Sequence, residues 1–120
     1  MKSLVPWIDA LKSGEYKKGK YYLGQIVEEV PEYCCLGVLC ELEKIPSKHD
    51  NILDNHSILY GGYAKTLPEY LRYKYNISDI LHYNLSHAND INDTFDEVIK
   101  ILEREEEARQ SLKEGNCDVV

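Results

Sequence analysis

The alternation of apolar and polar residues predicts a helix close to the start of the chain. Its apolar face is formed at three- and four-residue spacing by Leu4, Trp7, Ile8 and Leu11. Ser3 is suited to cap this helix, and Pro6 is tolerated because it falls in the first turn. We expect Gly14 to end it.

A second helix is predicted from Tyr33 to Leu42, where apolar residues follow one another almost without interruption. Such a segment is typical of a helix that is buried on most sides. Gly37 lies in its middle and costs about 1 kcal/mol relative to alanine in a helix. We therefore expect another part of the molecule, or a ligand, to pack closely against this glycine.

Between and after these helices the pattern favours short strands and loops. Residues 15–30 combine lysines and glycines with a Gln-Ile-Val run, which predicts a surface loop and one strand, or a hairpin. The polar residues 43–57 are interpreted as a loop, and residues 57–60 as a short strand that ends at a Gly-Gly turn. Thr66 and Pro68 are expected to open a short helix.

The clearest helix is the last one. Thr94 and Glu97 stand at the spacing of a capping box. The apolar face that follows consists of Phe95, Val98, Ile99, Ile101 and Leu102. We expect one globular domain over residues 1–114 and a mobile C-terminal tail over residues 115–120. The predicted fold class is α+β, a mainly helical small domain with a short β-hairpin or a small antiparallel sheet.

Charge and length limit the classes of partner. The 14 lysines and arginines against 21 aspartates and glutamates give a net charge of -7, which repels a nucleic-acid duplex. No apolar run approaches the roughly 20 residues that span a bilayer, so we expect a cytoplasmic protein without a membrane partner. Positive charge is nevertheless concentrated at Lys12, Lys17, Lys18 and Lys20, which leaves room for a local anion site.

The four cysteines, at positions 34, 35, 40 and 117, are interpreted as free thiols. A zinc site completed by His49 or His56 would need cysteines two to four residues apart on a tight turn, and these are embedded among apolar residues. Interior packing is the favoured interpretation. We predict no metal ion and no cofactor.

A cysteine nucleophile would need a lowered pKa and a nearby base. Cys34 or Cys35 at a helix start meets part of that condition, but neither His82 nor His87 can be assigned as the base from the sequence. The sequence therefore favours a binding protein over an enzyme, with no catalytic residue.

Two further segments leave their interpretation open. Gly14, Gly19 and Gly24 among the lysines could cradle a phosphate, yet no Walker or dinucleotide fingerprint is present, and an ordinary solvated loop fits equally well. The Asn and Asp residues at 89–93 lack the glycine and distal glutamate of a calcium loop. Turn and cap chemistry before the last helix is the simpler explanation.

Three segments together resemble a family of small phage-encoded proteins that carry a YCCLGVLC motif. They are Leu11–Tyr16 with Gly19, then Tyr33–Leu42, and then Leu85–Asp90 with Thr94–Phe95. The resemblance implies an anti-defence sponge, which sequesters a cyclic oligonucleotide signal of bacterial CBASS immunity without cleaving it. One departure is residues 91–93, where the family tends to place a glycine after Asn-Asp, which puts the loop shape there in doubt.

Under that implication the protein is a homo-oligomer in the cytoplasm of an infected host cell. Stacking on tyrosine rings and charge pairing with lysines then suggest the ligand-binding residues, which are Tyr16, Lys18, Lys20, Tyr22, Asn89 and Asp90. Two alternatives stay open. One is an acidic inhibitor whose C-terminal helix, residues 97–114, docks on a host protein or mimics DNA charge. The other is a nucleotide-degrading or thiol-dependent enzyme.

Overall fold

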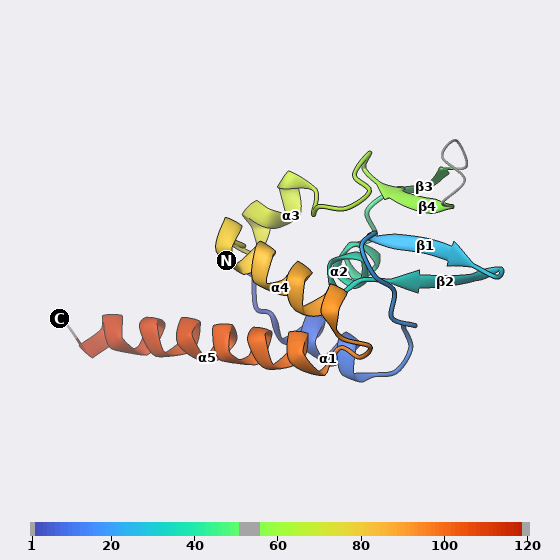
Figure 1. The fold of residues 1–120 in the computed structure, drawn as a ribbon. Helices are drawn as coiled ribbons and strands as arrows, with labels where there is room; N and C mark the ends of the chain where they lie inside the picture. Colours follow the sequence, from blue (N-terminus) through green and yellow to red (C-terminus); the bar gives the residue numbers. More distant parts are fainter. Residues whose placement is uncertain (1, 51–55, 119–120) are drawn as a thin grey trace.

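The computed structural model describes residues 2–50 and 56–118, which form helices around a small antiparallel sheet (Figure 1). In chain order the elements are α1 (Val5–Lys12), β1 (Gly24–Val27), β2 (Val30–Tyr33), α2 (Cys35–Leu42), β3 (Ser47–Asp50), β4 (Ser57–Tyr60), α3 (Glu69–Lys74), α4 (Asp79–Ile91) and α5 (Asp96–Asp118). The predicted α+β class, mainly helical with a small sheet, is confirmed.

The sheet has the strand order β2-β1-β4-β3, and all neighbouring strands are antiparallel. Strands β1 and β2 form a hairpin in which Ile26 is opposite Pro31. This proline is tolerated because β2 is an edge strand. The prediction of a loop over residues 43–57 was wrong in part, because Ser47–Asp50 pairs with β4 as strand β3.

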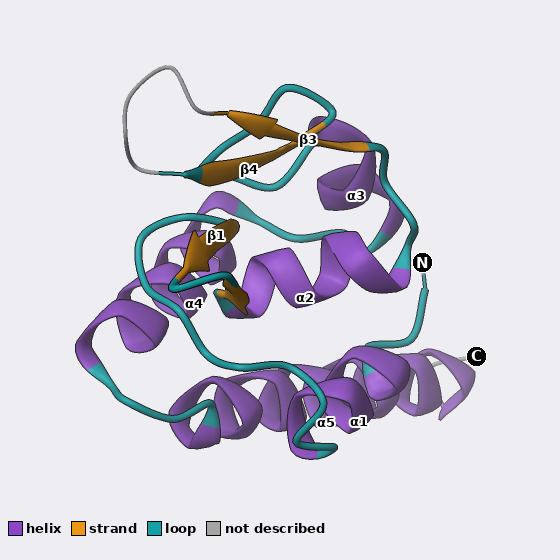
Figure 2. Cartoon of the chain, turned by 90° about the vertical axis from the view of Figure 1, so that its right-hand side faces the viewer, coloured by secondary structure: helices purple, strands orange, loops and turns teal. Residues whose placement is uncertain are grey.

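Helix α2 lies in the middle of the molecule, between the strands and the pair formed by α1 and α5 (Figure 2). Its residues from Cys35 to Cys40 are all buried. A Cβ built on Gly37 would lie 1.7 Å from the carbonyl oxygen of Leu23, so the expected close neighbour is present. Trp7 of α1 is fully buried, and its Nε1 donates to the carbonyl oxygen of Cys35 at 2.8 Å.

The start of α1 is held by α5. The helix begins at Val5 with Leu4 as its N-cap residue, so the predicted cap at Ser3 is one position early. The carboxylate of Glu106 accepts hydrogen bonds from the Leu4 amide and the Ser3 hydroxyl, both at 2.8 Å. Burial alone would raise the pKa of Glu106, but these hydrogen bonds lower it below its usual value.

Helix α4 was not predicted. Ser78 caps it by accepting a hydrogen bond from the Leu81 amide at 3.1 Å. Because the helix extends to Ile91, the prediction of a turn over residues 89–93 was wrong for its first three residues. Large apolar side chains on the outer face of α4 stay exposed, and they are Ile80, Tyr83 and Ile91.

The apolar face predicted for the last helix is confirmed: Phe95, directly before α5, is buried together with Val98 and Leu102, and Ile99 and Ile101 are partly buried against the core. The helix continues to Asp118, beyond the predicted domain end at residue 114, and the last two residues of the predicted tail lie outside the described residues. Within residues 2–50 and 56–118, no helix is both long and apolar enough to cross a membrane.

Candidate functional site

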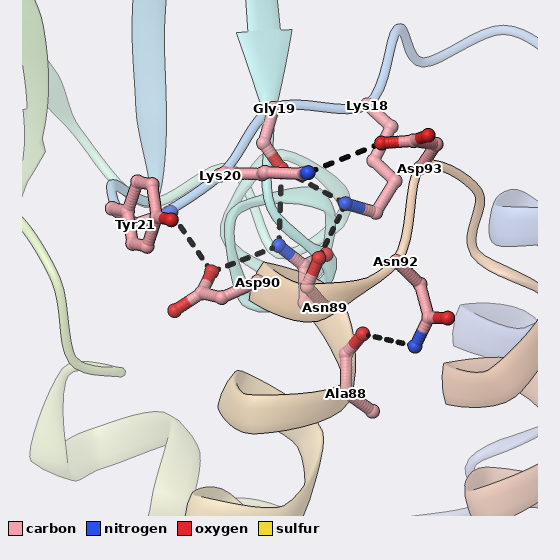
Figure 3. A network of polar contacts seen from close by, with 9 residues as sticks. All are labelled: Lys18, Gly19, Lys20, Tyr21, Ala88, Asn89, Asp90, Asn92 and Asp93. Atoms are coloured by element: carbon pink, nitrogen blue, oxygen red, sulfur yellow. Dashed lines mark hydrogen bonds and ion pairs between the residues drawn. The ribbon is translucent and has the colours of Figure 1, made fainter.

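The lysine-bearing loop, residues 18–22, is attached to the C-terminal turn of α4. Asn89 is fully buried, and its Nδ2 donates to the carbonyl oxygen of Gly19 at 3.0 Å (Figure 3). Its Oδ1 accepts from the Cys35 amide at 3.0 Å. Lys18 Nζ donates to the carbonyl oxygen of Asn89, which places a cation at the negative end of the α4 dipole.

Two further contacts complete this attachment. Lys20 Nζ lies 3.1 Å from Oδ1 of Asp93, and the backbone amide of Tyr21 donates to Oδ1 of Asp90 at 2.9 Å (Figure 3). Tyr21 has a φ of +71°, a left-handed conformation that is uncommon for a tyrosine. Its side chain is 62% exposed, so the strained backbone presents an aromatic ring at the surface.

Beside this ring lies a hollow of about 290 Å³. It is lined by Tyr21, Cys34, Leu36, Lys65, Thr66, His82, Ser86 and Asp90. His82, Ser86 and Asp90 follow one another at four-residue spacing, so one side of α4 supplies an imidazole, a hydroxyl and a carboxylate. Lys65 Nζ lies 5.2 Å from the ring centroid of Tyr22, within reach of a cation-π interaction.

Burial controls the protonation of the groups in and beside this hollow. The pKa of His82 is lowered by burial and by the nearby charge of Arg72, and its Nε2 accepts from the Leu67 amide at 3.2 Å. His82 is therefore neutral at pH 7. The pKa of Lys18 is lowered by burial and by Lys20, while its bond to Asn89 keeps the amine in place.

The cysteines in α2 and at its N-cap belong to the core. Cys34, Cys35 and Cys40 are buried and free, in agreement with the interior packing predicted for them. Burial raises the pKa of the Cys34 thiol to about 11 and that of Cys35 well above its usual value. Both thiols are protonated at neutral pH, a state that is neither nucleophilic nor suited to metal binding.

The structure brings four of the six predicted ligand-binding residues together, namely Lys18, Lys20, Asn89 and Asp90. Tyr22 adjoins the hollow through Lys65. Tyr16 packs edge-on against Tyr33, with ring centroids 5.5 Å apart, and does not line the hollow. Ligand binding by these six residues stays a prediction. The contacts that they make in the structure are with other residues of the chain.

Of the eight residues that line the hollow, only Asp90 was among the predicted ligand-binding residues. Tyr21, Lys65 and Ser86 were not predicted as site residues, and His82 was considered only as a catalytic base. The spacing of His82, Ser86 and Asp90 was a usable signal, but only for a segment already assigned as a helix. Lys65 gave no signal, because the fold alone brings it to Tyr22.

The glutamates of α5 are largely engaged within the domain. Glu103 pairs with Lys12 of α1 at 2.9 Å, and Glu105 pairs with Arg109 at 3.2 Å. Glu106 holds the start of α1. In the described part of the chain, no group of three or more His, Cys, Asp or Glu side chains is arranged to hold a metal ion.

Comparisons with known proteins give one match. The sequence profile of a family described as a domain of unknown function (DUF8296) matches residues 1–106. No curated protein and no solved structure matches the chain.

Proposed function

The chain belongs to the DUF8296 family, and from the chemistry of the hollow we propose that it binds a cyclic oligonucleotide messenger and sequesters it without cleavage. The supporting observation is the hollow where Tyr21 and Lys65 face the polar side of α4. An exposed aromatic ring suits stacking on a base, and a lysine suits a phosphate. Ser86 and Asp90 offer the hydroxyl and carboxylate that can read a base edge.

The size of the hollow supports an oligonucleotide that is only partly enclosed. Ligand pockets usually measure about 300–1,000 Å³, and this hollow of about 290 Å³ suits one nucleotide unit. The rest of a cyclic ligand would extend outside, where a second copy of the chain can contact it. We therefore propose a homo-oligomer acting in the cytoplasm of an infected cell.

Sequestration is favoured over cleavage by the state of the reactive groups near the hollow. The Cys34 and Cys35 thiols are buried and protonated. The ring nitrogen Nε2 of His82 is engaged with the Leu67 amide, which leaves it poorly placed to take a proton from a nucleophile. These features argue against a thiol-dependent or nucleotide-degrading enzyme.

The acidic-inhibitor alternative has less support. An acidic helix that mimics DNA or docks on a basic protein would present its carboxylates to the partner. In α5, Glu103, Glu105 and Glu106 are already bound to groups of this domain.

Isothermal titration calorimetry against a panel of cyclic di- and trinucleotides tests the proposal. We expect one member to bind, and expect Lys65→Ala and Tyr21→Ala each to weaken binding at least tenfold. Lys48→Ala, at an exposed lysine of β3, is the matched control. No binding across the panel would overturn the proposal. Heat-released ligand, analysed by mass spectrometry, should be intact, and a cleavage product would overturn the absence of catalysis.

A further inference from the structure

An open groove with a volume of about 790 Å³ lies between α1 and α5. On the α1 side it is lined by Val5, Ile8, Asp9 and Lys12, and Val5 is 46% exposed. Figures 1 and 2 show α1 alongside the first part of α5, while the C-terminal part of α5 extends away from the other elements. The groove therefore lies open to a partner along an extended helix.

The α5 side of the groove carries an alternating row of charges, formed by Lys100, Glu103, Arg104 and Glu107. Residues three and four positions apart lie on one face of a helix, so the charges along the row are positive, negative, positive and negative. Lys100 and Glu103 have partners in the chain, Glu97 and Lys12. Arg104 and Glu107 are exposed, and among the residues up to 112 whose side chains the structure describes they form no salt bridge.

We propose that this groove is a contact surface between two copies of the chain, with the α5 helices antiparallel. In a two-fold contact, each residue pair occurs twice. An axis between residues 103 and 104 places Lys100 of one copy opposite Glu107 of the other, and Glu103 opposite Arg104. All four side chains then face opposite charges, and the exposed Val5 is covered.

A second copy fits this row better than other partners do. The row contains equal numbers of positive and negative side chains. A surface that binds a basic peptide would instead carry a uniformly acidic row. The net charge of -7 repels a second copy at long range, so a contact between copies needs local complementarity of this kind. Helix α5 has 23 residues and is about 35 Å long, enough for an extended contact.

The contact through α5 does not involve the nucleotide site. The groove and the hollow share no lining residue, so a dimer through α5 leaves the hollow open. Self-association through α5 and nucleotide binding at the hollow can therefore be measured separately, and either of these two can fail without the other.

The contact is tested by sedimentation velocity on the wild-type chain and on charge-reversal variants. Protein concentrations of 1–100 µM cover about two decades. We expect the wild-type chain to form dimers, and expect Lys100→Glu and Glu107→Lys each to weaken self-association at least tenfold, because each places like charges opposite one another. An equimolar mixture of the two variants should form dimers again. In the mixed dimer the introduced glutamate of one variant faces the introduced lysine of the other, and the two unaltered side chains face one another as in the wild type. Circular dichroism confirms that each variant is folded.

The mixture distinguishes a contact between copies from an effect within one chain, because an intrachain defect is not rescued by a second variant. A wild-type chain that stays monomeric to 100 µM, an upper limit set by the experiment, would overturn the proposal. So would dimers that neither reversal weakens, or a mixture that fails to dimerise. A foreign protein that occupies the groove of a monomeric chain would overturn the choice of partner.

Discussion

Asn89 donates a hydrogen bond from Nδ2 to the carbonyl oxygen of Gly19 at 3.0 Å, and so joins the last turn of α4 to a loop 70 residues away in sequence. The opposite end of the same amide accepts from Cys35 at the start of α2. One fully buried side chain thus connects three segments. The position of Tyr21 and of the hollow beside it depends on this connection.

Replacing Asn89 by alanine should destabilise the protein by about 2–3 kcal/mol, because the buried Cys35 amide loses its partner and the Gly19 carbonyl keeps only a longer hydrogen bond from Lys18 Nζ. Urea unfolding followed by circular dichroism measures the change. Asn84→Ala, at an exposed position of the same helix, is the matched control. A loss no larger than that of the control would show that the connection contributes little to stability.

Replacing Gly37 by alanine should also destabilise the fold, by at least about 2 kcal/mol, although alanine is the better helix former. The added methyl group would lie 1.7 Å from the carbonyl oxygen of Leu23, a backbone atom that cannot move independently. Thermal unfolding measures the effect. An increase in melting temperature would mean that the two segments can separate without cost.

In the native protein, the thiols of Cys34, Cys35 and Cys40 should resist labelling by a thiol reagent. The assay is run at pH 7.5, about one unit below the unperturbed thiol pKa of about 8.5. Burial excludes the reagent and keeps the thiols protonated. A Cys117→Ser chain restricts the assay to these three. Labelling should appear only with unfolding, and rapid reaction of one thiol in the native state would contradict its burial.

Stability should fall as the pH drops below about 6.5, the ordinary pKa of histidine. The pKa of His82 is lowered in the folded state, so the unfolded chain takes up the proton first, and the loss grows until the pH passes below the folded value. Urea unfolding between pH 7.5 and 5, a window chosen to span that value, measures how the free energy of unfolding changes with pH. The variant His82→Gln should reduce this pH dependence. If His82→Gln left the pH dependence of stability unchanged, that dependence would come from other groups. His49→Gln is the control.

The helices that the sequence predicted are those whose buried residues are apolar and regularly spaced, as in α1 and α5. Helix α4 has regularly spaced buried apolar residues too, Leu81, Leu85 and Ala88. Exposed apolar side chains such as Ile80 and Tyr83, and a buried polar one, Asn89, obscure that spacing in the sequence. Strand β3 has no apolar residue at all, and it is a strand because β4 supplies its hydrogen-bond partners. Such tertiary effects leave no periodic signal in the sequence.

The candidate site was predictable to a similar extent. The sequence pointed to two segments, one rich in lysine and the other rich in Asn and Asp. The structure joins these two segments by hydrogen bonds. Both groups were predicted to bind a ligand, whereas Lys18 and Asn89 each bind the segment of the other. Tyr21 was not predicted because its exposure follows from a left-handed backbone that a tyrosine rarely adopts.

The burial of Trp7 has a practical consequence, because it is the only tryptophan of the chain. Its indole is enclosed at the contact between α1 and α2, so its fluorescence emission should move to longer wavelength when that contact opens to water. Folding can therefore be followed optically, without a dye, at protein concentrations low enough to keep single chains apart.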